Sequence, residues 1–327
     1  MVQVFSKSNP TPDTAVVAAN SVVGPTIVTL SKFEGHTLEQ PINVFLPPDL
    51  DEDAFFKLCS ATEPPAYEFP ALRNWLSKML HNLKLQDLGN HPFHKNPYKL
   101  LEIHVQAVDW WVKKKKLGFM KILTRVETKS DEGEGKNKSK PWLPGAVFLR
   151  GGSVAILVYK YSKGEDGKHV ILTVQPRVAA GSLAFTEIPA GMLDGEGNFE
   201  IKALKEIKEE TELEVKKDEL VDMSALAAEA GGAAASFGTN GEKGEDAVYP
   251  SVGACDEYIP IMLCQKTLSE KEMQEVQGKA TGLRKEGERI SLKLVPLGEV
   301  WKEASRDAKA LAAVALYNAL KREGKVT

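Results

Sequence analysis

The sequence has few cysteines, and this scarcity excludes a protein built on disulfides. Its 327 residues include Cys59, Cys255 and Cys264, an odd number with no C-x-x-C spacing. Such usage is typical of a reducing compartment. The first 25 residues contain one lysine and no arginine, so we expect neither a secretory nor a clear organellar presequence. We therefore expect a cytoplasmic protein, with an organelle as the alternative.

Long apolar runs and a strong charge of one sign are also missing. The longest apolar runs, residues 154–158 and 259–264, are much shorter than the roughly 20 residues that span a bilayer. The net charge of -3 argues against an extended nucleic-acid surface. We expect a soluble protein with neither membrane nor nucleic acid as a partner. Its 43% apolar residues are enough for a sizeable core.

The first part of the chain predicts a small domain rich in strands. Residues 1–25 resemble a poorly ordered arm. Apolar residues at helical spacing predict a helix over 70–86. Strands are predicted over 100–111 and 118–126, joined by a lysine-rich turn, and the polar segment 128–141 is a candidate linker. We expect an N-terminal α+β domain over residues 26–141 for dimerisation and base recognition.

The second part predicts strands on both sides of a central helix. The helix covers 199–213, a flexible loop rich in alanine and glycine is expected over 224–247, and the last helix covers 307–322. Strands are predicted over 146–150, 154–161, 170–175, 258–265 and 291–295. This pattern favours an α/β sandwich over residues 142–327.

The central helix carries three carboxylates at positions that share one face. Glu206, Glu209 and Glu210 stand at i, i+3 and i+4. Like charges at i and i+4 cost a helix about 0.2–0.5 kcal/mol, so stability alone does not favour the arrangement. One interpretation is a site for a hard divalent cation. The other is an ordinary solvated charged face.

From Gly191 onward the chain resembles the Nudix hydrolase signature G-x5-E-x7-R-E-U-x-E-E-x-G-U, in which U is apolar. Six of its nine specified positions match, namely Gly191, Glu206, Ile207, Glu209, Glu210 and Leu213. Three depart from it. Gly197 replaces a glutamate, for which Glu196 or Glu200 could substitute, and Lys205 replaces an arginine without its planar fork. Glu212 replaces a glycine, so it must adopt a left-handed conformation or end the helix differently.

Three further segments resemble the ADP-ribose and ADP-sugar pyrophosphatases of this family. They are Gln175-Pro176-Arg177, Glu187 to Gly191, and Ser251 to Glu257, and the likeness extends through 277–284 and 307–309. It is close to fungal and plant-type ADP-sugar diphosphatases over about residues 65–325. Val252 and Ala254 depart from the usual Pro and Gly. The resemblance implies a Nudix-type α/β/α sandwich with a mixed sheet, preceded by a smaller β-rich domain.

The resemblance also implies the chemistry. It implies hydrolysis of the diphosphate of ADP-ribose or ADP-glucose to AMP and a sugar phosphate, with Mg2+ as cofactor and Mn2+ as the alternative. The implied metal ligands are Glu206, Glu209, Glu210 and the main-chain carbonyl of Ala190. Glu257 is the implied general base, and Glu288 is the second candidate.

Other residues are expected to contact the substrate. Arg177 suits a phosphate contact, or alternatively a structural ion pair. Glu187 is expected at the substrate or a second metal, and Gly191 at the substrate. Trp110 or Trp111 is expected to stack on adenine, with core packing as the alternative fate of at least one.

The resemblance further implies a homodimer in which the N-terminal domain helps to complete the partner's site. A Nudix hydrolase acting on UDP-sugars, NADH or dinucleoside polyphosphates is an alternative, because pocket shape decides the substrate. A non-catalytic nucleotide-sugar sensor or interaction module is the alternative of another class, suggested by the three departures from the signature.

Overall fold

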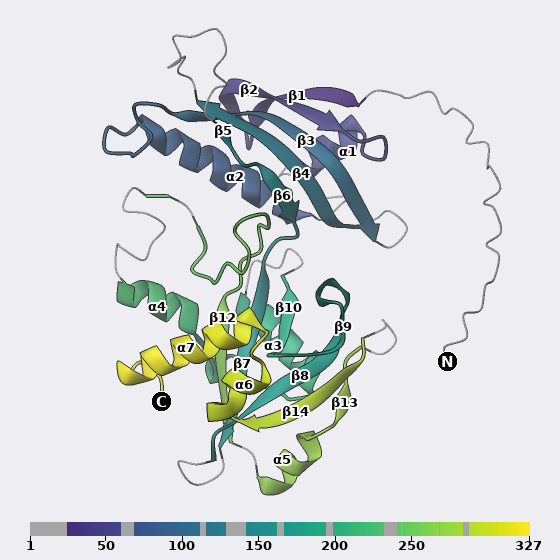
Figure 1. Ribbon diagram of the computed structural model, residues 1–327, viewed down its shortest axis with the longest axis vertical. Coiled ribbons are helices and arrows are strands. Elements are labelled where there is room, and N and C mark those ends of the chain that lie inside the picture. The colour runs from purple at the N-terminus through teal and green to yellow at the C-terminus, as the bar shows by residue number, and fades with distance from the viewer. Residues whose placement is uncertain are drawn as a thin grey trace, which may run out of the picture.

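The structure is a computed structural model, and its ribbon contains two sheets, one from each part of the chain (Figure 1). It describes residues 25–59, 69–111, 116–128, 142–161, 167–193, 199–231, 241–242, 244–267, 269–283 and 288–327. The predicted arm, except for its last residue, and the candidate linker, except for its first, lie outside these residues, as do residues 112–115 of the lysine-rich turn.

The first sheet has the strand order β1-β2-β3-β4-β5, with β6 also paired to β4. Its strands are β1 (Thr26–Phe33), β2 (His36–Leu46), β3 (Tyr98–Trp111), β4 (Lys116–Thr128), β5 (Trp142–Leu143) and β6 (Ala146–Leu149). α1 (Glu52–Cys59) and α2 (Pro70–Lys84) pack into its core. Pro70 begins α2, where a missing N–H costs nothing, and Leu72 and Leu76 are its buried residues one turn apart. The helix predicted from residue 70 and the two long antiparallel strands are confirmed.

The change from one sheet to the other occurs later than expected. β5 and β6 pair with β4, so residues 142–149 belong to the first sheet rather than to a second domain beginning at residue 142. The pattern of a four-residue strand does not reveal which sheet it joins. Gly151, with a positive φ of 78°, follows in the connection to the second sheet.

The second sheet has the strand order β11-β12-β7-β8-β14-β13, with β10 on β7 and β9 on β8. Its strands are β7 (Ser153–Tyr161), β8 (His169–Arg177), β9 (Ser182–Glu187), β10 (Ala190–Met192), β11 (Leu220–Asp222), β12 (Ile261–Thr267), β13 (Ala280–Thr281) and β14 (Ile290–Pro296). β7 and β12 run parallel, and the other pairs are antiparallel. The sheet is therefore mixed.

Helices cover both faces of the second sheet (Figure 1). α3 (Phe199–Thr211) and α5 (Glu270–Val276) share one apolar core with it. α4 (Met223–Gly231), α6 (Val300–Glu303) and α7 (Ala308–Arg322) share the core on its other face. Short 3-10 helices are η1 (Leu85–Asp87), η3 (Val178–Ala180), η4 (Lys217–Glu219) and η7 (Leu297–Glu299). The predicted α/β/α sandwich, with a β-rich unit before it, is confirmed.

The expected loop over residues 224–247 begins instead as a helix. α4 starts at Met223, and the Asp222 carboxylate accepts a hydrogen bond from the Ala225 N–H at 2.9 Å, which caps its first turn. Its alanines favour helix, and it packs near α7. Residues 232–240 and 243 lie outside the described part. None of the helices in the described ranges has both the length and the apolar character needed to cross a membrane.

Candidate active site

α3 buries two of its three carboxylates. Glu206 is 8% exposed and Glu210 is 5% exposed, whereas Glu209 is only partly buried. Ala203 and Ile207 of the same helix pack into the core, which brings the neighbouring glutamates down against β10. The interpretation of the face as ordinary solvated charge is therefore wrong for Glu206 and Glu210.

Glu210 is held from three directions. Its Oε1 accepts a hydrogen bond from Gln175 Nε2 at 3.2 Å, and its Oε2 accepts one from the Ala190 N–H at 3.1 Å. Its main-chain oxygen accepts the Thr281 hydroxyl at 2.5 Å. Burial, followed by repulsion from Glu206, raises the pKa of Glu210 to about 8. The carboxylate is thus fixed in place but unfavourable in its charged form without a cation.

Glu206 lies directly against the Pro-Ala-Gly turn. A Cβ at Gly191 would come within 1.9 Å of the Glu206 Cδ, so the turn requires glycine for this approach. Lys202, one turn earlier on α3, pairs with Glu206 Oε1 at 2.8 Å. Burial raises the pKa of Glu206, the Lys202 ammonium opposes this shift, and the charges of Glu209 and Glu288 add to it.

The donor set fits a hard divalent cation. Within the described ranges, no three Asp, Glu, His or Cys side chains form a compact cluster that could hold a metal ion. Glu206 and Glu210 nevertheless supply carboxylate oxygens, the donors that Mg2+ prefers, and their mutual repulsion raises the pKa of Glu210. A cation between them would remove that repulsion. Glu209, whose side chain is 25% exposed, stands beside them on the same helix.

A second charged network surrounds Glu187, two residues before the Pro-Ala-Gly turn. Glu187, 2% exposed, accepts hydrogen bonds from Arg177 Nε at 2.5 Å and from Lys309 Nζ at 2.9 Å. Lys309 also contacts Asp307 at 2.7 Å, and Asp307 accepts the Ile188 N–H at 3.1 Å. The start of α7 therefore fixes the strand end that leads into the turn. The charge of Glu187 also contributes to the raised pKa of Glu210.

Arg177 makes the structural ion pair that the sequence left as one alternative, but its side chain is still 41% exposed. The two alternatives are therefore compatible, because one edge of the guanidinium group can contact Glu187 while another remains accessible. The sequence did not predict the contacts of Lys309 with Glu187 and Asp307. The only signal for Lys309 was its place in the 307–309 segment of the family likeness.

Glu257 lies in a loop that is attached to the first sheet. Its Oε1 accepts the Ser153 hydroxyl at 2.8 Å and lies 3.2 Å from Arg150 Nη1. Asp256 accepts the N–H groups of Arg150 and Gly151 at 2.8 and 3.1 Å. These partners are about one hundred residues away along the chain, so no sequence spacing could have identified them.

Glu288 is placed differently. Its Oε2 accepts the Leu283 N–H at 3.1 Å, and its charge contributes to the raised pKa of Glu206. The charge of Glu288 thus acts on one carboxylate of α3, that of Glu206. Residues 284–287, which connect it to Leu283, lie outside the described part of the chain.

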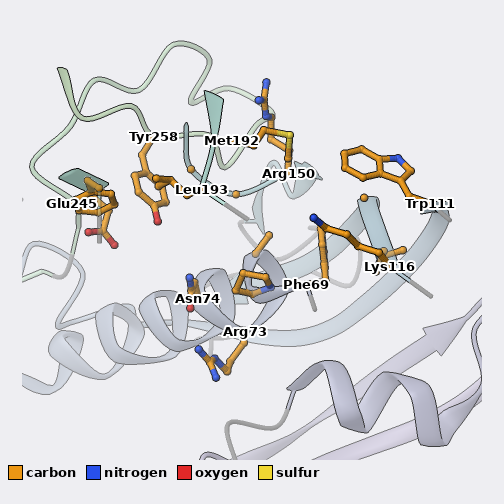
Figure 2. Close-up of a pocket in the computed structure, with 17 residues that line it drawn as sticks. Phe69, Arg73, Asn74, Trp111, Lys116, Arg150, Met192, Leu193, Glu245 and Tyr258 are labelled. Carbon is orange, nitrogen blue, oxygen red and sulfur yellow. The ribbon is translucent and has the colours of Figure 1, made fainter. Parts of the chain in front are cut away.

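A cavity of about 310 Å³ lies between the two sheets, next to the turn. Figure 2 shows Trp111 and Lys116 towards one end and Tyr258 and Glu245 towards the other. Met192, the residue after Gly191, also lines it, so the cavity reaches the neighbour of the turn, although the three carboxylates of α3 do not line it. The remaining lining residues are Phe69, Pro70, Ala71, Arg73, Asn74, Leu117, Gly118, Arg150, Gly151, Gly152, Leu193 and Phe199.

The two adjacent tryptophans have different surroundings. Trp110 packs against the core of the first sheet, whereas Trp111 lines the cavity. A Cβ at Gly118 would come within 2.1 Å of the Trp111 ring, so this ring packs directly over a glycine. Adjacent strand residues point to opposite faces, which explains the different surroundings.

Comparison with known proteins identifies one similar curated protein. The chain is 32% identical over 263 residues to "Nudix hydrolase 14, chloroplastic" from Arabidopsis thaliana, covering 80% of this chain and 74% of that protein. A solved structure described as an ADP compounds hydrolase matches 70% of this chain and 97% of its own, at 15% identity and a TM-score of 0.42. No protein-family model matches the sequence.

Proposed function

Because the chain belongs to the Nudix hydrolase family, we propose that it hydrolyses the diphosphate of ADP-sugars, such as ADP-ribose and ADP-glucose, to AMP and a sugar phosphate. The observation that carries this proposal is the pair of buried carboxylates, Glu206 and Glu210, packed against the turn at Ala190 and Gly191. Buried charges of the same sign are costly unless a cation compensates them.

The proposed cofactor is Mg2+, with Mn2+ as a substitute. Glu206, Glu209, Glu210 and the carbonyl of Ala190 would hold it. Bound there, the ion would neutralise the diphosphate and lower the pKa of a coordinated water. The protein's own contribution is to fix these oxygens, which the hydrogen bonds of Gln175 and the Ala190 N–H to Glu210 support.

Glu257 and Glu288 are the two candidates for the general base. The contacts with Ser153 and Arg150 fix the orientation of the Glu257 side chain, which favours Glu257 as the general base. Glu288 acts electrostatically on Glu206, which favours a position closer to the metal ligands. Replacing the true base by glutamine is expected to lower turnover by about 10²- to 10⁴-fold. Parallel assays of Glu257→Gln and Glu288→Gln therefore distinguish them, and a loss below about tenfold in both would refute a fixed general base.

The cavity supports recognition of the nucleotide. Trp111 offers an aromatic face, and Lys116 and Arg150 offer positive charge for phosphate. We propose that Trp111 stacks on adenine, in preference to Trp110, which packs against the core. Arg177, through the exposed part of its side chain, and Glu187 behind it would orient the diphosphate beside Gly191.

The test is hydrolysis of ADP-ribose, ADP-glucose and UDP-glucose, each with Mg2+ and with Mn2+, with the products identified. We expect metal-dependent release of AMP that Glu210→Gln abolishes. A preference for UDP-glucose over both adenylates would refute the ADP-sugar assignment in favour of another Nudix substrate. Tight nucleotide-sugar binding without hydrolysis would instead support a sensor.

A homodimer is part of the proposal. On the face of the first sheet away from α1 and α2, Ile27, Phe45, His104 and Leu123 pair in register across four strands. Ile27 is 59% exposed and Leu123 is 41% exposed, so a row of three apolar residues and one histidine is open to a partner. Sedimentation of the wild type and of Leu123→Glu tests this, and a monomeric wild type would refute it.

A further inference from the structure

Lys202 of α3 is a buried lysine in contact with the carboxylate cluster. Its side chain is 6% exposed, and its Nζ lies 2.8 Å from Glu206 Oε1. An ammonium group is costly to bury unless it is paired. At i and i+4 on the helix, Lys202 and Glu206 are neighbours on the same face, so the pairing follows directly from their spacing.

Lys205 stands where the family pattern has arginine, but it is poorly placed to orient the cluster. Its side chain is 53% exposed, and its Nζ is 3.9 Å from Glu209 Oε1. An exposed pair at that distance contributes little to stability. The close, shielded contact to a carboxylate of the cluster is therefore made three residues earlier, by Lys202.

We propose that Lys202 is the positioning residue of this metal site, and that its ammonium group holds the Glu206 carboxylate directed over Gly191, ready for a divalent cation. This inference rests on the proposed metal-dependent function. Without Lys202, Glu206 would lose the buried contact at 2.8 Å that directs its carboxylate. The side chain could then move away from Gly191, and a displaced carboxylate binds a cation weakly.

The contact with Gly191 explains why orientation matters. The glutamate carboxylate occupies the space that a Cβ at Gly191 would fill, so it already lies at the turn that carries Ala190. Residues that orient a metal ligand typically change metal affinity by about 10- to 100-fold when they are replaced. We expect Lys202 to act in the same way on Glu206.

The test compares Lys202→Met with the matched control Lys205→Met. Methionine retains most of the length and apolar character of the lysine stem while removing the charge. Binding of Mn2+, without substrate, is followed by the electron paramagnetic resonance signal of the free ion, and thermal unfolding confirms that both variants fold. We expect Lys202→Met to weaken Mn2+ binding by about tenfold or more, and Lys205→Met to change it by less than about threefold.

Kinetics supply a second measurement. For Lys202→Met we expect a higher Mg2+ concentration for half-maximal activity, with a smaller change in kcat at saturating Mg2+. If Lys202→Met does not fold, Lys202→Gln removes the charge but keeps an N–H donor, and it should show the same weakened Mn2+ binding. Unchanged or tighter Mn2+ binding in the folded Lys202 variant would overturn the inference. A wild type that binds no Mn2+ would overturn the proposed function itself.

Discussion

Glu212 ends α3 in a conformation that favours glycine. Its φ is 58°, in the left-handed region, where a side chain costs about 1–2 kcal/mol relative to the usual regions. Its Oε2 also lies 2.8 Å from Lys279 Nζ, with side chains 52% and 40% exposed, and such a pair contributes about 0.2–1 kcal/mol. The two effects oppose each other, because glycine would relieve the first and lose the second.

We therefore expect Glu212→Gly to change the free energy of unfolding only slightly, and Glu212→Ala to be less stable than Glu212→Gly by about 1 kcal/mol. Both variants lose the ion pair, so their difference isolates the backbone conformation. Lys279→Met measures the ion pair alone. For a chain of 327 residues, 1 kcal/mol corresponds to a shift of about 1–2 °C in the unfolding temperature.

The assay is thermal unfolding followed by calorimetry, with urea unfolding as a check. Equal stability of the glycine and alanine variants would refute the argument, because alanine cannot adopt the left-handed conformation as easily as glycine. A Lys279→Met variant that loses several kcal/mol would show that the ion pair, rather than the backbone, dominates at this helix end.

Three other predictions follow from the carboxylate cluster and its surroundings. Because the pKa of Glu210 in the fold is about 8, the folded state holds a proton that the unfolded chain releases between about pH 5 and pH 8. The metal-free protein should therefore lose stability as the pH rises through this range. Urea unfolding with a chelator should show this loss, and Glu210→Gln should remove most of it. Gly191→Ala should displace the carboxylate of Glu206 and weaken Mn2+ binding with little loss of stability, whereas unchanged binding would contradict the close contact. Lys309→Met should destabilise the protein by about 3–5 kcal/mol in urea unfolding, since it removes a partner from buried Glu187, and a loss below about 1 kcal/mol would contradict this.

The carboxylate helix was the part of the site that the sequence could predict. Spacing alone put Glu206, Glu209 and Glu210 on one face, and the structure buries two of them. Spacing could not decide which lysine would contact them, because Lys202 and Lys205 both precede a glutamate by four residues. Burial distinguishes them, and burial depends on which face of α3 meets the sheet.

Sheet membership and long-range contacts were harder to predict from the sequence. A four-residue strand such as β6 carries no signal for its partner, so residues 142–149 were expected in the wrong sheet. The Ala-rich segment after Asp222 was expected to be a loop, although its alanines and its cap favour the observed helix. The contacts of Glu257 with Ser153 and Arg150 depend on chain segments brought together by the whole fold.

Two of the three departures from the family signature, Lys205 and Glu212, are explained by their structural neighbours, whereas the third, Gly197, lies outside the described residues. The lysine that replaces arginine at position 205 is exposed, and a buried cation at Lys202 contacts the same cluster. The glutamate that replaces glycine at position 212 keeps the left-handed conformation and gains a partner in Lys279. In both cases a charge that is not specified by the signature stands beside the altered position. The variants of Lys202 and Glu212 therefore address one question, which is whether local charge can replace the geometry that arginine and glycine provide in the family pattern.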